Sequence, residues 1–423
     1  MKKFKILWLS HSDVDTSLNS SDRGWVNMLL DEIKSEVDLH VAVIEGKPDQ
    51  LINGATKHII KSRFRKIRVA LHILYGYRNT EGNLEFELIE LIKKVKPDLI
   101  HIHGTEKQFI RIVPFLNEAN IPYLISLQGL ISVVSKKYTA GYSELFIRFF
   151  VTNFGFTKRH LLPRTNFKIY QAFKRHSRLE DRIMQKAKNF AGRTEWDASI
   201  SSLLNPRSKY FKVNRILKPV FYESFWDNIH PNKGSLRIHT TTSNSFYKGF
   251  EIISEAAYLL QRSGYNVEWN IAGILANDWS VRAAKKKLKN RYGEGCFVFK
   301  GKISAQELVE SMLASDLYVS ASHIENSPNS VAEAQLIGMP CIATGVGGTA
   351  TYIEHNISGI IVPPGDPYAL AGAIKEIYEN NEKRKSLSRN ARNIAAIRHK
   401  KSQIKQDILK AYAEIIASSF RAE

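Results

Sequence analysis

The sequence contains little cysteine and no long hydrophobic run. Its two cysteines, Cys296 and Cys341, lie in apolar, strand-like stretches, which indicates a reducing compartment and no disulfide framework. No stretch approaches the roughly 18 consecutive apolar residues that a membrane-spanning helix needs. The N-terminal MKKFKILWLSHSD imitates a signal peptide, but its apolar run is short and lacks a small-residue cleavage site, so it fits a first buried strand better. We therefore expect a cytoplasmic protein, soluble or peripheral on the inner face of the cytoplasmic membrane.

Acidic residues are scarce relative to basic ones. The chain has 61 Lys and Arg against 41 Asp and Glu, a net charge of +20, and residues 136–193 alone hold 14 basic and 3 acidic residues. Aromatic residues are interleaved with these charges, as in FIRFFVTNFGF at 146–156. Such a segment is typical of contact with an anionic membrane surface or a charged acceptor. The alternatives are a helical insertion with a solvated basic face, or a nucleic-acid contact, for which no motif is present.

The order of apolar and amphipathic stretches predicts two α/β domains. Short apolar runs that read as buried parallel strands alternate with helical stretches, first from KILWLS at 5–10 and again from LRIHTTTS at 236–243. Such alternation produces doubly wound parallel sheets, whose ligands lie beyond the carboxyl ends of the strands. We predict four parts. Residues 1–210 form an N-terminal domain with a basic insertion at about 136–190, and residues 211–234 form a linker. Residues 235–399 form a C-terminal domain, and residues 400–423 form a last helix.

The stretch from Ser322 to Gly348 carries the clearest chemical signal. Two carboxylates, Glu325 and Glu333, are eight positions apart, in what reads as a loop leading into a helix. We expect Asn329 and Ser330 to cap that helix at its N-terminus. The following strand, CIAT, ends in a glycine-rich turn, where the backbone can lie close to a ligand. A helix N-terminus facing such a turn favours phosphate, and carboxylates nearby accept hydrogen bonds from sugar hydroxyls. The pattern indicates a nucleotide-sugar site.

This pattern resembles the donor site of glycosyltransferase family 4, retaining enzymes of the GT-B fold and of the bacterial surface-polysaccharide type. The resemblance extends from the two glutamates through the Gly-x-Pro strand and Gly-Gly turn to the segment 358–366. A Lys-Gly pair of the same family is present at Lys248. The matching positions of the first segment are Glu325, Glu333, Gly338, Pro340, Ile342, Ala343, Gly347 and Gly348.

The resemblance implies a GT-B fold, with two Rossmann-like domains facing a cleft, and a last helix that crosses back to the N-terminal domain. It implies that Glu333 holds the ribose and that Lys248 neutralises the leaving group. It also implies that the donor sugar and diphosphate are held by Glu325 and by the amides near Asn329, Ser330 and Gly348. The implied reaction moves a hexose or N-acetylhexosamine from a nucleotide diphosphate sugar to a lipid-linked or saccharide acceptor. We expect no metal and no cofactor.

The chain departs from the family pattern at several positions. Ser243 stands where the family has an arginine, so Asn244 or a basic residue from elsewhere must compensate. Gln128 stands where a histidine is usual, and glutamine cannot exchange a proton near neutral pH. Gly24 is the single glycine of the N-terminal loop. The strand-end rule adds His103 and Glu106 to the candidate acceptor residues, and the basic segment adds Arg148, Lys158 and Arg159.

Three other interpretations stay open. An epimerase of the same fold would share the diphosphate site, and a non-catalytic sugar-nucleotide-binding protein would explain Ser243 and Gln128. A membrane-binding or nucleic-acid-binding protein would retain only a vestigial cleft. The Asp-x-Asp triplet at Asp13 and Asp15 is expected by chance in a chain of this length, so it is not read as a metal site.

Overall fold

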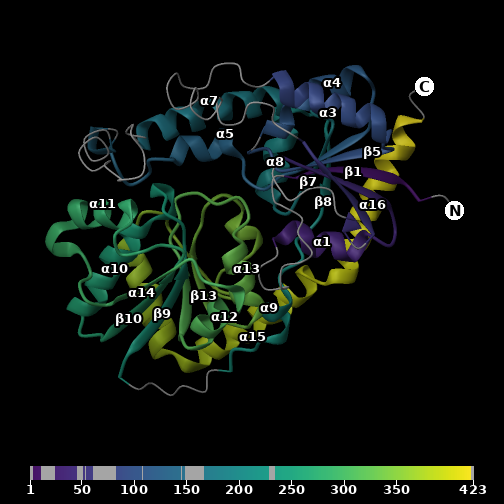
Figure 1. Ribbon diagram of the computed structural model, residues 1–423. Helices are drawn as coiled ribbons and strands as arrows, with labels where there is room; N and C mark the ends of the chain where they lie inside the picture. The colour runs from purple at the N-terminus through teal and green to yellow at the C-terminus, as the bar shows by residue number, and fades with distance from the viewer. Residues whose placement is uncertain are drawn as a thin grey trace.

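The computed structural model describes the chain over the ranges 3–10, 24–44, 51–52, 54–60, 82–106, 108–143, 145–147, 166–227 and 234–420. Over these ranges the chain forms two α/β domains, one at the upper right and one at the lower left of Figure 1. Each domain is built on one sheet with helices on both faces. The predicted fold class, two Rossmann-like domains of the GT-B type, is confirmed.

The N-terminal sheet has the strand order β3-β4-β2-β1-β5-β6-β7-β8, and its pairs are parallel except for β3 with β4. Apolar side chains from the two faces of the sheet form separate cores, one of which includes Trp8 and the other Tyr123. The strands are β1 (Lys5–Ser10), β2 (Asp38–Val43), β3 (Leu51–Ile52), β4 (Ala55–Ile59), β5 (Leu99–His103), β6 (Tyr123–Ser126), β7 (Asn189–Gly192) and β8 (Lys209–Lys212).

The helices of the N-terminal domain connect these strands and cover the sheet (Figure 1). Helix α7, the longest described helix of this domain, carries part of the basic segment at residues 136–193. It buries Tyr170, Glu180 and Ile183 at helical spacing and leaves Lys174 and Arg175 exposed. The helices are α1 (Trp25–Ile33), α3 (Gly82–Val95), α4 (Val113–Glu118), α5 (Ile131–Val134), α7 (Asn166–Met184) and α8 (Glu195–Leu204).

The C-terminal sheet has the order β11-β10-β9-β12-β13-β14, and all of its pairs are parallel. The chain order reverses between β9 and β12, which makes their carboxyl ends the switch point where ligands bind in such sheets. The strands are β9 (Leu236–Thr241), β10 (Val267–Ala272), β11 (Phe297–Gly301), β12 (Leu317–Ser320), β13 (Cys341–Thr344) and β14 (Ile360–Val362).

The helices around this sheet are α9 (Pro219–Glu223), α10 (Phe250–Arg262), α11 (Trp279–Leu288), α12 (Ala305–Leu313), α13 (Asn329–Leu336), α14 (Pro367–Glu379) and α15 (Asn381–Arg398). The segment 211–234, predicted as a linker, contains the end of β8 and all of α9. Helix α9 packs against α12 and α13, so this part of the segment belongs structurally to the C-terminal domain.

The last helix, α16 (Lys401–Ser419), lies against the N-terminal domain, beside α1 (Figure 1). Its Tyr412 is buried, and the hydroxyl accepts a hydrogen bond from Trp8 Nε1 at 3.0 Å. The same hydroxyl lies 2.6 Å from His101 Nδ1, and burial lowers the pKa of His101 to about 3. The neutral ring therefore donates at one nitrogen and accepts at the other, bonding Tyr412 through Nδ1 and Ser126 Oγ, 2.7 Å away, through Nε2.

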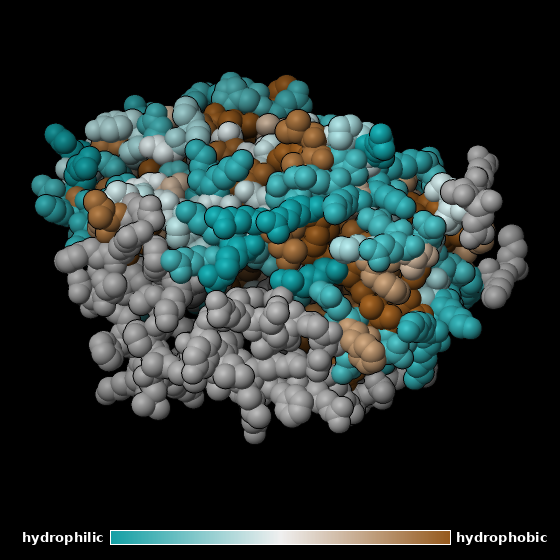
Figure 2. Space-filling model, turned by 90° about the horizontal axis from the view of Figure 1, so that it is seen from above, coloured by the Kyte–Doolittle hydropathy of each residue, from teal (hydrophilic) through white to brown (hydrophobic). Residues whose placement is uncertain are grey.

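Seen from above, hydrophilic side chains cover most of the described surface, with hydrophobic residues in smaller areas between them (Figure 2). Among the described residues, no helix combines the length and the apolar character needed to cross a bilayer.

Candidate functional site

Lys248 and Glu325 meet at the switch point of the C-terminal sheet. Lys248 ends a short 3-10 turn that follows β9, and Glu325 lies in the loop that follows the neighbouring strand β12. Lys248 Nζ is 2.5 Å from Glu325 Oε1, which also accepts a 2.7 Å hydrogen bond from Ser322 Oγ. Burial alone would lower the pKa of Lys248, but the charge and hydrogen bond of Glu325, together with Tyr247, outweigh burial and raise that pKa. A fixed ammonium ion is thus held at the strand ends.

Two glycine turns enclose the backbone that carries Glu325. At Gly249 φ is +69°, and a Cβ there would lie 2.0 Å from the Ala321 carbonyl oxygen. At Gly347 φ is +51°, and a Cβ would lie 1.8 Å from the Glu325 carbonyl oxygen. The Gly348 amide donates to that same oxygen at 3.0 Å. Only glycine permits this approach, so the turns fix the Glu325 loop between Lys248 and the Gly-Gly segment.

Helix α13 begins directly after the Glu325 loop. The expectation that Asn329 and Ser330 cap this helix is wrong, because Pro328 is the N-cap residue and Asn329 is already helical. The difference changes their contribution: they present first-turn backbone amides, which have no intrahelical acceptor. Such amides can still bind an anion at the positive end of the helix dipole.

Glu333 lies one turn further along α13 and faces the segment that joins the domains. Burial raises the pKa of its carboxyl group to about 7, although Lys218 and Arg215 lower it in part. This carboxyl group therefore changes between neutral and ionised forms near neutral pH.

Two residues that the sequence placed near the donor have other surroundings. Asn244 Oδ1 accepts a hydrogen bond from the Ser280 amide at 3.0 Å, so this oxygen fixes the start of α11. Ser243 is exposed and supplies no charge.

A second carboxylate lies beside the Lys248 turn. Glu251 Oε1 is 2.7 Å from His323 Nε2, and both side chains are largely buried. Gly141 of the N-terminal domain packs directly onto this pair, because a Cβ there would lie 2.1 Å from Glu251 Oε1. No sequence pattern indicates this contact, since the three residues are remote along the chain.

Gln128 lies where the two domains touch. Its carbonyl oxygen accepts a 2.9 Å hydrogen bond from Asn326 Nδ2, in the loop between Glu325 and α13. Nearby, Thr194 at the start of α8 packs against Gly348, since a Cβ on that glycine would lie 2.5 Å from Thr194 Cγ2. These contacts place the carboxyl ends of β6 and β7 beside the C-terminal site.

His103 ends β5 within a cluster of rings. Its centroid is 3.9 Å from that of His101 and 4.5 Å from that of Trp8. Burial, with the neighbouring His101 and Arg215, lowers the pKa of His103 well below its usual value, so the ring is neutral. Glu106 lies beneath Gly104, where a Cβ would meet the carboxylate at 2.7 Å.

Gly24 is the exposed N-cap residue of α1. The candidate acceptor residues Arg148, Lys158 and Arg159 lie outside the described residues, as do Asp13 and Asp15. Over the part of the chain that is described, no three His, Cys, Asp or Glu side chains group in a way that could hold a metal ion.

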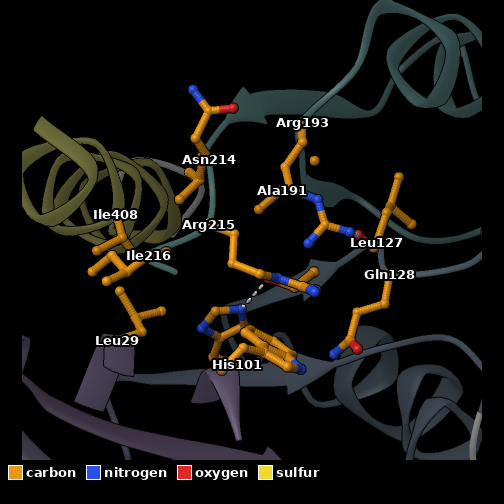
Figure 3. Close-up of a pocket in the computed structure, with 14 residues that line it drawn as sticks. Leu29, His101, Leu127, Gln128, Ala191, Arg193, Asn214, Arg215, Ile216 and Ile408 are labelled. Atoms are coloured by element: carbon orange, nitrogen blue, oxygen red, sulfur yellow. Dashed lines mark hydrogen bonds between the residues drawn. The ribbon is translucent and has the colours of Figure 1, made fainter. Parts of the chain in front are cut away.

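The sequence interpretation overlooked two arginines that converge beside Gln128 (Figure 3). Arg193 follows β7, so the strand-end rule that selected His103 would also have selected it. Arg215 lies after β8, in a segment expected to be a linker, and no sequence signal marks it. The two arginines line a pocket with Gln128, Ser126, Asn214 and Trp25.

Comparisons with known proteins find sequence similarity in the C-terminal part of the chain. Residues 229–394 match the family model described as "Glycosyl transferases group 1". The D-rhamnosyltransferase WbpZ of Pseudomonas aeruginosa is 28% identical over a segment that covers 34% of this chain and 37% of WbpZ. The chain thus matches well under half the length of this curated relative.

Solved structures resemble the whole chain. Sucrose-phosphate synthase from Thermosynechococcus elongatus aligns with a TM-score of 0.72 at 16% identity, over 98% of this chain and 99% of that one. HepE from Anabaena, solved in complex with UDP and glucose, aligns with a TM-score of 0.63 at 16% identity, over 97% and 99%. At these identities the likeness shows a shared fold.

Proposed function

We propose, from the match of residues 229–394 to the family model of glycosyl transferases group 1, that the protein transfers a sugar from a nucleotide diphosphate sugar to an acceptor. The observation that carries the proposal is the Lys248–Glu325 ion pair, held between two glycine turns at the switch point. A partly buried cation beside the first-turn amides of a helix suits a diphosphate that gains charge as the glycosidic bond breaks. The sugar is a hexose or N-acetylhexosamine, transferred with retention at the anomeric carbon.

Each donor group has a counterpart in the site. Lys248 neutralises the leaving diphosphate, and the amides near Asn329, Ser330 and Gly348 bind its oxygens. Glu333 accepts hydrogen bonds from the ribose hydroxyls. Glu325 accepts a hydrogen bond from a hydroxyl of the donor sugar and also orients Lys248. No side chain is assigned as a nucleophile: the acceptor hydroxyl attacks the anomeric carbon on the face that the diphosphate leaves, and the departing phosphate takes the acceptor proton. That HepE was solved with UDP and glucose supports a nucleotide-sugar ligand for this fold.

The acceptor enters past the basic part of the N-terminal domain. Lys136 and Lys137 line a pocket of about 380 Å³ that His323 and Pro364 complete from the C-terminal domain. The exposed basic face of α7 continues the positive charge. These features support a lipid-linked or saccharide acceptor of cell-surface polysaccharide assembly, and a peripheral position on the inner face of the cytoplasmic membrane.

The Glu333 assignment predicts that donor binding tightens as the pH rises. The pKa of Glu333 is raised to about 7, so the carboxyl group is largely protonated at pH 6 and ionised at pH 8. The ionised form accepts the stronger hydrogen bonds from hydroxyl groups. We expect the dissociation constant of the tightest-binding nucleotide sugar, measured by calorimetry, to fall several-fold between pH 6 and pH 8.

Glu333→Gln is the matched control, because it keeps the shape of the side chain and cannot ionise. We expect it to bind the donor at least tenfold more weakly at pH 8 and to show little change with pH. An equally steep pH dependence in wild type and Glu333→Gln would contradict the assignment of Glu333.

A further inference from the structure

Arg193 and Arg215 are buried without the partners that buried charges normally have. Only 6% of Arg193 and 8% of Arg215 is exposed to solvent. Arg193 Nη2 donates to the Leu127 carbonyl oxygen at 3.1 Å, but the Nε atoms of both arginines have no hydrogen-bond partner among the described residues. An unpaired buried charge is costly unless something else compensates it.

The two guanidinium groups point into the same pocket. Arg193 extends from the carboxyl end of β7 and Arg215 from the segment after β8, and both reach toward Gln128 (Figure 3). Trp25 fixes Arg215 from one side, because the guanidinium carbon lies 4.4 Å from its ring centroid. The pocket thus presents planar, pre-oriented donors.

The local charge balance favours an anion in this pocket. Burial lowers the pKa of Arg215 well below its usual value, and the nearby positive charge of Arg193 lowers it further. Glu106 and Glu333 raise the pKa of Arg215, but by less than burial and Arg193 lower it. A ligand with two negative oxygens would offset both positive charges and use their free N–H groups.

We propose that Arg193 and Arg215 form a phosphate-binding pocket in the N-terminal domain, distinct from the Lys248 site of the C-terminal domain. A guanidinium group binds phosphate oxygens in a bidentate manner, and two such groups from different strands fix its position. The pocket adjoins the donor loops, because Gln128 contacts Asn326 and Thr194 contacts Gly348. A phosphate bound there lies beside the proposed donor site.

The phosphate has two possible sources, the donor diphosphate and a phosphate group of the acceptor. The assignment of the phosphate to a substrate rests on the proposed glycosyl transfer. The binding of phosphate by the two arginines does not depend on that proposal. The test therefore uses inorganic phosphate first and a nucleoside diphosphate second.

The first measurement is the thermal stabilisation of the protein by inorganic phosphate, at constant ionic strength. We expect the dissociation constant to rise at least tenfold in Arg193→Gln and Arg215→Gln. It should stay unchanged in Arg207→Gln, an exposed arginine of the same domain. Equal stabilisation of wild type and both pocket variants, or its loss in Lys248→Ala alone, would overturn the proposal.

A measurement on the wild-type protein covers the case in which a pocket variant does not fold. Phenylglyoxal modifies arginine, and mass spectrometry of peptides locates the modified residues. We expect phosphate to protect Arg193 and Arg215 and to leave Arg207 reactive. Equal modification of the pocket arginines with and without phosphate would refute the proposal.

The second arm titrates the same variants with UDP. Weakened UDP binding in the Arg193 and Arg215 variants assigns the pocket to the donor, and unchanged UDP binding with lost phosphate binding assigns it to the acceptor. If phosphate binds through the arginines but no nucleotide sugar binds at all, the proposed function fails and the pocket stands.

Discussion

Replacement of Lys248 by alanine is expected to lower kcat about 100- to 1000-fold, with a smaller effect on donor affinity. Negative charge on the diphosphate grows as the glycosidic bond breaks, so the ammonium group stabilises the transition state more than the bound donor. Glu325 fixes this group at 2.5 Å, so no reorganisation is needed as the charge develops. Steady-state kinetics of nucleoside diphosphate release provide the measurement.

Lys302→Ala is the control for this experiment, since Lys302 is an exposed lysine of the same domain. It should leave both kcat and KM unchanged. A Lys248→Ala variant with a raised KM and an unaltered kcat would instead show that the lysine binds donor and transition state equally.

Replacement of Tyr412 by alanine is expected to lower the free energy of unfolding by about 3–5 kcal/mol, the usual cost of removing a large buried aromatic ring. Tyr412 joins α16 to the N-terminal sheet through packing and through its contacts with Trp8 and His101. Tyr412→Phe keeps the ring but leaves two buried polar atoms without their partner. It should cost about 1–3 kcal/mol. Denaturant unfolding, followed by circular dichroism, provides the measurement.

Tyr368→Ala serves as the control, because 69% of that side chain is exposed. Its effect should stay within about 0.5 kcal/mol. A Tyr412→Ala variant as stable as this control would show that α16 does not hold the N-terminal domain.

The sequence was sufficient to place Lys248 and Glu325 each after a predicted strand of the C-terminal domain. Buried parallel strands produce apolar runs, and the polar residues that follow them lie at one edge of the sheet. The sequence could not show that the two side chains form an ion pair, because they are 77 positions apart. That contact depends on the strand order, in which β12 lies beside β9.

Contacts between the domains were also beyond sequence reasoning. Gly141 packs against Glu251 and His323, although nothing in the local sequence of any of them signals the others. Likewise, the sequence placed Arg215 in a predicted linker. Only the folded structure shows that Arg215 lines a pocket with Arg193 and that its guanidinium group lies over Trp25. Local periodicity predicts elements, whereas such clusters depend on the packing of both domains.

The central claim is that the site around Glu325 cleaves a nucleotide diphosphate sugar. Its most direct test measures nucleoside diphosphate release from a panel of nucleotide sugars, with and without lipid-linked and saccharide acceptors, by wild-type protein and Glu325→Ala. We predict release from at least one donor by the wild type and at least tenfold slower release by the folded variant, which lacks a charge-assisted hydrogen bond worth about 1.5–3 kcal/mol. Absence of release from every donor, or equal release by both proteins, would contradict the proposed function.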